Sequence, residues 1–264
     1  MRTNDVIGLI PCGGHATRIA PLPCSKEVLP LGLRRLKDRS LQPRVVSHSL
    51  LEQMREGGVR KAFFILRNGK WDIPQYYGNG AMIGMDLGYL MMGKPYGTAY
   101  TLDAAYPFVR GARIALGFPD ILFKPRDAFA RALKRLAATR TGLVLGLCRV
   151  RDPSISDMVD VERSGRVREL VIKPERTKLK LGWVFAVWTS KFTEFMHEYL
   201  LTPRTAAELS GTGLPEELTV GDVIQAALSM GLPTQSVIFS RQTFLDIGTP
   251  GGLVEAVRES VSPA

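Results

Sequence analysis

A glycine turn, one arginine and one lysine stand close together near the start of the chain. An apolar run at residues 6–10 leads into a small-residue turn at 12–14, and Arg18 and Lys26 follow it among several prolines. A buried strand that ends in a glycine turn leaves backbone N–H groups free, because no side chain blocks the approach of a large anion. The sequence therefore predicts a phosphate-binding loop with two cations beside it.

The spacing of this loop differs from two common phosphate-binding motifs. A Walker A loop, GxxxxGK[ST], has a lysine directly after its second glycine, and no lysine stands next to Gly13 or Gly14. The dinucleotide-binding spacing GxGxxG is missing as well. We therefore expect a phosphate site of a different class from these two.

Charged side chains also follow three predicted strands, close to the point where each strand ends. Asp120 comes shortly after the strand that ends in ALG, Lys173 lies in VIKPE, and Asp246 lies in FLDIG. In a doubly wound sheet, ligands bind beyond the carboxyl ends of the strands. A purely structural residue at such a position is more often apolar or a turn former. We expect these three side chains to share a site with the glycine turn.

The first of these regions resembles the signature of the sugar-nucleotide pyrophosphorylases, a nucleotidyltransferase family, and is nearest to its glucose-1-phosphate thymidylyltransferases. The signature runs GGxGTRxxPxTxxxxKxxxPv, and this chain reads GGHATRIAPLPCSKEVLP. The matching positions are Gly13, Gly14, Thr17, Arg18, Pro21, Lys26 and Pro30. One family glycine is replaced by Ala16, and alanine strongly disfavours positive φ. The loop must therefore keep an ordinary conformation at Ala16 or be strained there.

The resemblance extends over nearly the whole chain and implies roles for the charged residues at the strand ends. The metal-binding aspartate of the family's LGDxxF motif is similar to Asp120, with two residues inserted before it. The lysine of EKP matches Lys173, and the aspartate of WLDxGT matches Asp246. The implied reaction joins a nucleoside triphosphate to a sugar-1-phosphate, releases pyrophosphate and gives an NDP-sugar. Asp120 and Asp246 would hold Mg²⁺ as the cofactor, because this hard cation prefers carboxylate and phosphate oxygens.

The same resemblance assigns catalysis to the cations. Arg18 would hold the triphosphate, Lys26 would lie near the α-phosphate, and Lys173 would attract the sugar phosphate. The implied nucleotide-binding residues are Cys12, Gly13, Gly14, Thr17, Met92 and Gly97. The implied sugar-phosphate-binding residues are Asp157, Ile172, Lys173 and Trp183. No Ser/His/Asp or Cys/His set for nucleophilic catalysis is evident.

Three positions depart from the family pattern. The family's base-reading glutamine falls on Met92, and the glutamate before its EKP lysine falls on Ile172. The glycine before its hairpin strand falls on Asp157. The residues expected to bind phosphate thus match the family pattern, whereas those expected to bind the base and the sugar differ from it. The sequence therefore leaves the identity of the base and of the acceptor undecided. Asp157 or Trp183 would line an altered sugar pocket, although Trp183 also fits an ordinary core position.

Length and composition are those of an ordinary globular protein. The chain has 264 residues, of which 45% are hydrophobic and 23% charged. We expect one domain over residues 1–264, with a nucleotide-binding half at 1–150 and a sugar-phosphate-binding half at 151–264. The sequence shows neither a membrane span nor a signal peptide, so we expect a cytoplasmic protein without a membrane partner. Three cysteines without CxxC spacing and three scattered histidines indicate neither disulfides nor structural zinc.

The formal net charge of +10 could indicate a nucleic-acid binder. However, the basic residues are scattered and are not interleaved with aromatic residues that would stack on bases. A basic surface that attracts anionic substrates explains the charge as well. We therefore expect a nucleoside triphosphate and a sugar-1-phosphate as partners and no nucleic acid, and a homo-oligomer stays open.

Strand patterns alternate with helical patterns, which predicts an α/β fold with a Rossmann-like, doubly wound mixed sheet and a smaller β-rich insertion on the substrate side. Strands are predicted at residues 6–10, 61–66, 85–91, 112–117, 142–148, 158–162, 166–172, 182–188, 237–239 and 243–246. Helices are predicted at 45–54, 97–106, 126–138, 191–200, 220–230 and 250–259. Residues 68–84 look irregular, and 202–217 are expected to form a mobile loop.

Two alternatives to the main interpretation keep the fold. The first is a cytidylyltransferase-like enzyme that acts on a non-sugar phosphate such as phosphocholine, for which Ile172 and Asp157 leave room. The second is a regulatory or scaffold relative without catalysis. Such a relative would be expected to have lost some of the five charged residues, and this chain keeps Arg18, Lys26, Asp120, Lys173 and Asp246.

Overall fold

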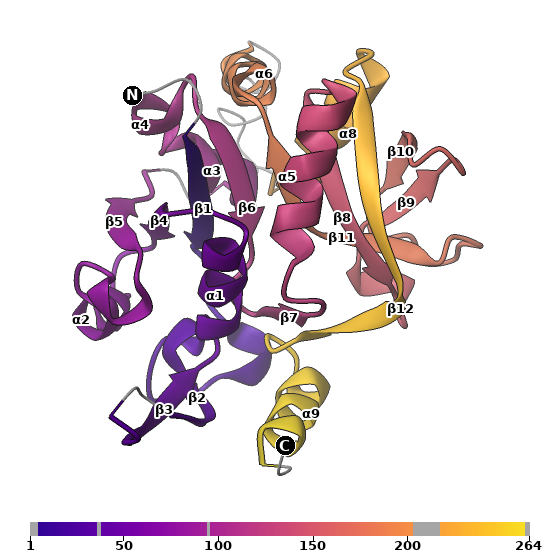
Figure 1. Cartoon of the computed structure of the whole chain (residues 1–264). Coiled ribbons are helices and arrows are strands. Elements are labelled where there is room, and N and C mark those ends of the chain that lie inside the picture. Colours follow the sequence, from indigo (N-terminus) through magenta and orange to yellow (C-terminus); the bar gives the residue numbers. More distant parts are fainter. Residues whose placement is uncertain (1–4, 36–37, 94–95, 203–216, 262–264) are drawn as a thin grey trace, which may run out of the picture.

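The computed structural model describes residues 5–35, 38–93, 96–202 and 217–261 (Figure 1). Its strands are β1 (Val6–Cys12), β2 (Pro30–Arg35), β3 (Leu41–Val45), β4 (Lys61–Leu66), β5 (Asp86–Met91), β6 (Arg113–Gly117), β7 (Ile121–Phe123), β8 (Leu143–Arg149), β9 (Met158–Val161), β10 (Val167–Val171), β11 (Leu181–Trp188) and β12 (Thr234–Asp246). Its helices are α1 (His48–Glu56), α2 (Asp72–Tyr77), α3 (Thr98–Asp103), α4 (Tyr106–Val109), α5 (Ala128–Thr139), α6 (Ser190–Leu200), α8 (Val220–Ser229) and α9 (Pro250–Val261).

One large mixed sheet organises the molecule. Its strand order is β5-β4-β1-β6-β11-β8-β12-β7, and the β9–β10 hairpin joins it through β11. Strands β5, β4, β1 and β6 run parallel, whereas β11 runs antiparallel to both of its neighbours, β6 and β8. The predicted doubly wound mixed sheet is confirmed, and strands from the second half of the chain lie between strands from the first.

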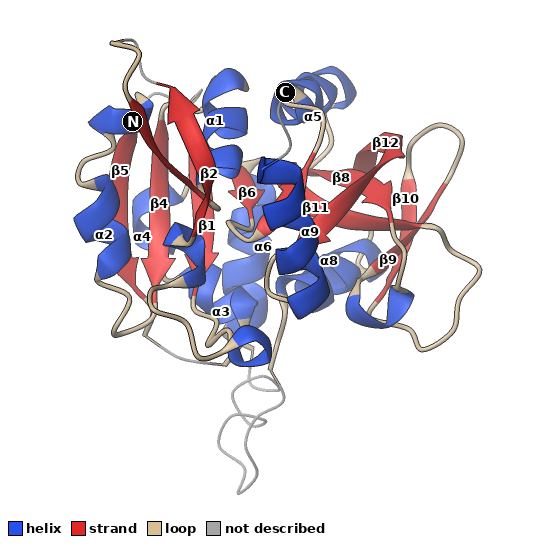
Figure 2. Ribbon diagram, turned by 90° about the horizontal axis from the view of Figure 1, so that it is seen from below, coloured by secondary structure: helices blue, strands red, loops and turns tan. Residues whose placement is uncertain are grey.

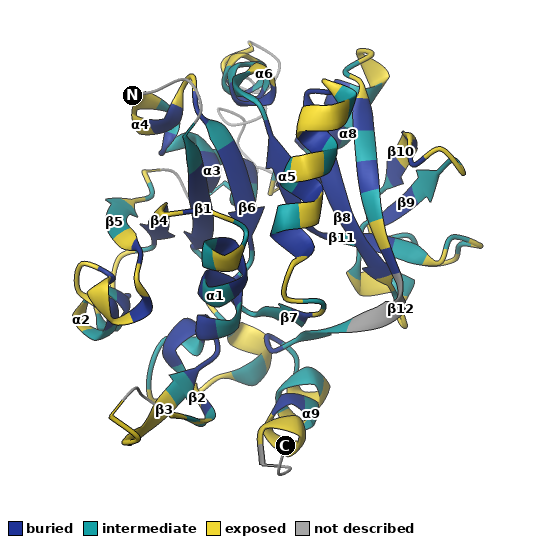
Figure 3. Cartoon of the chain, viewed as in Figure 1, coloured by how far each residue is buried: buried dark blue, intermediate teal, exposed yellow. Residues whose placement is uncertain are grey.

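Helices cover both faces of this sheet, as Figure 2 shows. Along each strand, successive side chains point to opposite faces, so Phe64 packs in one core and its neighbour Ile65 in the other. The first core lies under α1 and α5 and contains Leu50 and Phe129. The second lies under α3, α6 and α8 and contains Phe192. The central strands are accordingly buried almost throughout (Figure 3).

A two-stranded hairpin, β2–β3, stands apart from the main sheet and packs against α9 (Figure 1). The sequence pattern did not predict it, because its strands are short and carry prolines, a glycine and exposed basic residues. The helix predicted at 45–54 was therefore wrong at its start. Val45 is the last residue of β3 and pairs with Pro30, so α1 begins only at His48.

Three further predictions need correction. The two short strands predicted at 237–239 and 243–246 form one strand, β12, which pairs first with β8 and then with β7. The helix predicted at 97–106 is divided into α3 and α4. The irregular stretch at 68–84 contains α2 and a 3₁₀ turn. Most of the loop predicted at 202–217 lies outside the described residues.

In the part of the chain that the structure describes, no helix has both the length and the apolar character needed to span a bilayer.

Candidate active site

The glycine turn follows directly on β1 at the carboxyl end of the sheet. A Cβ added to Gly13 would lie 3.0 Å from the Met92 sulfur, and one added to Gly14 would lie 3.9 Å from Lys26 Nζ. The turn therefore runs between Met92 and Lys26, with no side chain of its own in the way. Ala16 has φ 55° and ψ 29°, so the second of the two expected outcomes holds and the loop is strained there.

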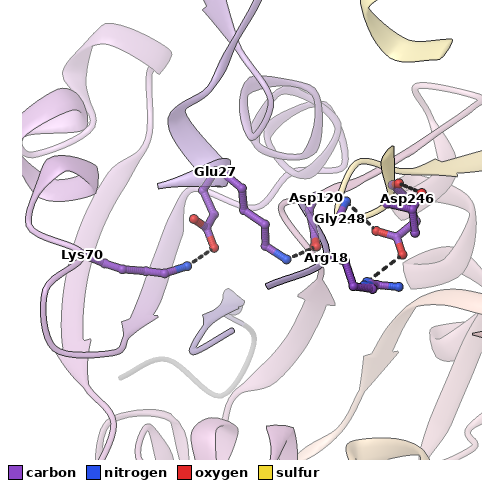
Figure 4. Close-up of polar contacts among 8 residues, drawn as sticks. Arg18, Glu27, Lys70, Asp120, Asp246 and Gly248 are labelled. Atoms are coloured by element: carbon purple, nitrogen blue, oxygen red, sulfur yellow. Dashed lines mark hydrogen bonds and ion pairs between the residues drawn. The ribbon is translucent and has the colours of Figure 1, made fainter. Parts of the chain in front are cut away.

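Two ion pairs connect this loop to the strand ends that carry the predicted metal ligands. Lys26 Nζ lies 2.5 Å from Asp120 Oδ2, and the Arg18 Nη2 atom lies 3.2 Å from Asp246 Oδ2 (Figure 4). Lys26, Asp120 and Asp246 are mostly buried, whereas the Arg18 side chain is 54% exposed. Four of the predicted site residues, from three distant parts of the sequence, are thus brought into direct pairwise contact.

Gly248 marks the point where these pairs converge. A Cβ at Gly248 would lie 2.9 Å from Asp246 Oδ1, 3.1 Å from Arg18 Nη2 and 3.4 Å from Asp120 Oδ2. The backbone N–H of Gly248 donates to Asp246 Oδ1 at 2.8 Å and fixes that carboxylate. The absence of a side chain thus lets the two carboxylates and the Arg18 guanidinium group approach the Gly248 backbone closely.

The two carboxylates suit a cation of the Mg²⁺ type. Two carboxylates from different strand ends face one point, and Mg²⁺ in phosphate-transfer sites is held by one or two carboxylates together with substrate oxygens. Within the described ranges there is no group of three or more His, Cys, Asp or Glu side chains that could hold a metal. The donor set therefore suits a metal that is shared with a substrate better than a closed structural site.

Lys26 stays charged in this environment. Burial by itself lowers the pKa of its ammonium group, but the charge and hydrogen bond of Asp120, together with the charges of Glu27 and Asp246, outweigh that effect and raise the pKa. The ammonium group is thus a permanent positive charge between the glycine turn and the first carboxylate.

A third ion pair involves Glu27, the residue that follows Lys26, and was not predicted. Lys70 Nζ lies 2.5 Å from Glu27 Oε1 (Figure 4), and both side chains are almost completely buried, at 6% and 1% exposure. The other carboxylate oxygen, Oε2, is buried without a hydrogen-bond partner. Glu27 is the neighbour of Lys26 in the same short 3₁₀ turn, so this pair fixes the turn that carries Lys26. The acidic residue beside Lys26 in the sequence was its only signal.

A pocket of about 320 Å³ opens beside the ion pairs, and six of the predicted site residues line it. They are Arg18, Asp120, Asp157, Lys173, Trp183 and Asp246. The other walls come from the β6–β7 connection, the turn before β9 and the N-terminal end of α8. Arg18, the two acids of the ion pairs and the residues predicted for the sugar phosphate therefore border one continuous space.

Asp157 and Trp183 form the far wall of this pocket. The Trp183 indole Nε1–H donates to Asp157 Oδ2 at 3.1 Å, and the Trp183 ring packs edge-to-face on Phe118 with centroids 5.5 Å apart. Burial raises the pKa of the Asp157 carboxyl, against the opposing effects of the Trp183 hydrogen bond and the Lys173 charge. Trp183 is only partly buried, so it is a pocket residue and not a pure core residue.

The remaining predicted residues lie around these two features. Lys173 is exposed at the mouth of the pocket, with a left-handed φ of 38°. Ile172 does not line the pocket and packs within the second core.

Gly97 precedes α3 with φ 108°, and a Cβ there would meet the Leu218 carbonyl oxygen, so backbone packing requires this glycine. Cys12 is buried at the end of β1, which raises the pKa of its thiol well above the ordinary value. Thr17 is exposed in the turn before Arg18.

Phe118 is the other residue that sequence reasoning missed. It is one of the two residues that stand between Gly117 and Asp120, where the compared motif has none. In the structure it leaves the strand β6 and packs on Trp183, so the insertion supplies one wall of the acceptor side of the pocket. A departure from the motif was therefore the signal that could have found it.

Comparison with known proteins agrees with this geometry. The model of the family described as Nucleotidyl transferase matches residues 7–262. The chain belongs to that family. Its members in the comparison include the low-salt glycan biosynthesis nucleotidyltransferase Agl11 of Haloferax volcanii, 22% identical over 254 residues, and a glucose-1-phosphate thymidylyltransferase of Streptomyces antibioticus, 25% identical over 258 residues.

These matches span nearly all of this chain, 94% and 95%, but only 64% and 65% of the relatives' own length. Solved structures with the same fold include a Bacillus anthracis protein in complex with sucrose, with a TM-score of 0.81 at 19% identity over 98% of this chain and 96% of that one. The UTP-bound UGPase of Acinetobacter baumannii gives a TM-score of 0.75 at 17% identity, over 97% and 93% of the two chains. At these identities the structural likeness establishes the nucleotide-diphospho-sugar transferase fold.

Proposed function

We propose that this chain transfers a nucleotidyl group from a nucleoside triphosphate to a sugar-1-phosphate, with release of pyrophosphate and formation of an NDP-sugar. The observation that carries the proposal is the convergence of Arg18, Asp120 and Asp246 beside Gly248, with Lys26 bound to Asp120. The family assignment and the activities named for relatives such as the Streptomyces antibioticus thymidylyltransferase support it.

The two cations on the loop carry the chemistry that lies nearest to the phosphates. Both reactants are polyanions, so the barrier depends on their repulsion and on the charge that develops on the leaving oxygen. Lys26 offers a compact, permanently charged ammonium group to the α-phosphate. Arg18, exposed at the pocket mouth, holds the leaving pyrophosphate with its planar pair of donors.

The acids act as partners of these cations until substrate binds. Asp120 and Asp246 hold Lys26 and Arg18 close to the positions where the triphosphate needs them, which limits the cost of ordering two long side chains. Asp120 and Asp246 are also the residues that would hold Mg²⁺. When bound, Mg²⁺ neutralises phosphate charge and helps to align the two reactants.

The remaining predicted residues divide between nucleotide and acceptor. We place the nucleotide on residues of the 1–150 half, along the turn formed by Cys12, Gly13, Gly14 and Thr17, with the base toward Met92 and Gly97. The acceptor lies in the pocket lined by Asp157, Lys173 and Trp183 of the 151–264 half, next to Ile172. A cytoplasmic location is consistent with three free cysteines, Cys12, Cys24 and Cys148.

The test is a pyrophosphate-release assay with Mg²⁺ over a grid of nucleoside triphosphates and phosphate acceptors. We expect release only when both substrates are present, in equal amount to the nucleotidylated acceptor. Chelation of the metal should stop the reaction. Pyrophosphate release that does not depend on any acceptor, or no release with any combination, would contradict the proposal.

A further inference from the structure

The acceptor side of the pocket contains a half-buried acid whose charge is offset only in part, because the effect of burial on its pKa outweighs that of the Lys173 charge. Asp157 Oδ2 accepts the Trp183 indole hydrogen bond, but Oδ1 is buried and has no hydrogen-bond partner. The ion pairs found among the described residues include Asp120 and Asp246 but not Asp157. A buried polar atom left in this state is costly, and a charged one more so, unless a ligand supplies the missing partner.

The surroundings of Asp157 fix its carboxylate in place. Gly221 lies near the start of α8, and a Cβ at this position would be only 2.3 Å from Asp157 Oδ2. The Cδ1 atom of Ile172 lies 3.1 Å from the same Cβ position. The carboxylate is therefore held by the indole of Trp183, the bare backbone of α8 and an apolar side chain, and none of the ion pairs among the described residues joins it to Lys173.

Aromatic rings stand beside this acid. Phe118 and Trp183 pack edge-to-face and both line the pocket together with Asp157. A cation is attracted to the face of an aromatic ring, most strongly when it is partly removed from water. A carboxylate next to two aromatic side chains is thus a chemical environment that favours a cationic group over a neutral hydroxyl.

We infer that the acceptor is a phosphate monoester that also carries a cationic nitrogen, with the phosphate toward Lys173 and Arg18 and the nitrogen toward Asp157 and the Phe118–Trp183 pair. This inference rests on the proposed nucleotidyl transfer and names the class of its acceptor. The pocket is lined by two cations, Arg18 and Lys173, and by an acid, Asp157, that forms an ion pair with neither of them, which is the complement of a zwitterion. A neutral sugar hydroxyl would satisfy the hydrogen bond of Oδ1 but would leave its charge unmatched.

Two kinds of molecule share this chemistry, namely amino-sugar 1-phosphates and amino-alcohol phosphates. The pocket of about 320 Å³ is at the small end of the range for ligand sites. Each kind of acceptor can be tested as a matched pair of compounds that differ only in the amine. The first pair is glucosamine 1-phosphate against glucose 1-phosphate. The second is phosphoethanolamine against 2-hydroxyethyl phosphate.

The experiment measures kcat/KM for all four acceptors with the full chain, Mg²⁺ and the best nucleoside triphosphate. We expect the amine member of at least one pair to exceed its neutral partner by about tenfold or more, the effect of one well-placed charge pair in a partly buried site. A preference within the first pair supports an amino-sugar phosphate, whereas a preference within the second pair alone supports an amino-alcohol phosphate and replaces the sugar-1-phosphate of the proposed function. Equal or better use of both neutral partners would overturn the inference while leaving the proposed reaction intact. If no acceptor supports pyrophosphate release, the proposed function itself fails.

A pair of aspartate variants shows whether Asp157 is the cause. Asp157→Asn keeps the shape and removes the charge, so the amine-over-neutral ratio should fall about tenfold, mainly through the KM of the amine acceptor. Asp160→Asn, on the same hairpin but outside the pocket, should leave the ratio unchanged. Thermal unfolding should show Asp157→Asn at least as stable as the wild type, because a buried unpaired charge is removed. An unchanged ratio in folded Asp157→Asn would overturn the assignment to Asp157.

Discussion

The two ends of the pocket treat charge in opposite ways. At the phosphate end, each loop cation has an acidic partner, Lys26 with Asp120 and Arg18 with Asp246. At the acceptor end, Asp157 is half-buried beside aromatic rings and forms no ion pair among the described residues, although the Lys173 charge acts on it. The first arrangement is suited to any triphosphate with its metal, whereas the second requires a partner of a particular kind. We propose that reaction chemistry and acceptor choice are located in separate parts of one site.

The largest effect that distinguishes the two ends should come from Lys26. Lys26→Met removes the charge nearest to the reacting phosphate and should lower kcat/KM about 10²–10³-fold with every acceptor, the usual effect of losing one preorganised donor to a developing charge. The matched control is Lys61→Met, which removes an exposed lysine at the first residue of β4, beside the start of β1 and not beside the glycine turn. Its activity is expected to stay unchanged. Steady-state pyrophosphate release measures both. A residual activity within a few-fold of the wild type would show that the phosphate end does not depend on this charge.

The buried pair behind Lys26 should dominate the stability of the phosphate end. Glu27→Gln or Lys70→Met alone leaves one buried charge without its partner and should cost about 3 kcal/mol in the free energy of unfolding. The double variant removes both charges, so its cost should be clearly smaller than the sum of the two single costs. Urea denaturation measures all three. Costs that simply add would mean that the two side chains do not act as a pair.

The next largest effect is expected from loss of the Asp246 carboxylate, which is proposed to hold the metal. Asp246→Asn keeps the size of the side chain but removes one of the two negative charges beside Gly248, and it can accept only one of the two hydrogen bonds that Asp246 accepts. Activity at saturating triphosphate should therefore fall about 10²-fold, and more Mg²⁺ should be needed for half-maximal rate. The comparison variant is Asp127→Asn, an exposed carboxylate at the start of α5. If the Mg²⁺ dependence of Asp246→Asn equals that of the wild type, this carboxylate is not part of a metal site.

The smallest effect should come from the strained loop residue at the phosphate end. Ala16→Gly restores the family glycine at φ 55° and should stabilise the fold by about 0.5 kcal/mol, because relief of the left-handed strain exceeds the extra entropy of the unfolded chain. Ala20→Gly, where φ is −71°, gains no relief and should lose a similar amount in the same urea series. A loss of stability in Ala16→Gly would show that the loop is not strained.

The sequence predicted the phosphate end far better than the acceptor end. Gly13, Gly14, Arg18 and Lys26 lie within one short window, and a local motif with fixed spacing can be read without knowing the fold. The acceptor end depends on contacts between distant segments. The approach of Gly221 to Asp157 and the packing of Phe118 on Trp183 arise only when α8, the β6–β7 connection and β11 come together.

The same reason explains what was missed in the fold. Long apolar runs such as β1 and β8 are buried on both faces and are recognisable from the residues alone. The β2–β3 hairpin is stabilised by its packing on α9 near the other end of the chain, and its own residues are mostly exposed or charged. No local pattern could show that partner.

The division of the pocket into two ends is tested most directly by one quantity, the ratio of kcat/KM for an amine acceptor to that for its neutral partner, measured in Lys26→Met and in Asp157→Asn. We predict that Lys26→Met lowers both values by the same factor and leaves the ratio at its wild-type level, whereas Asp157→Asn lowers the ratio about tenfold. A ratio that changes in Lys26→Met and stays constant in Asp157→Asn would contradict the account.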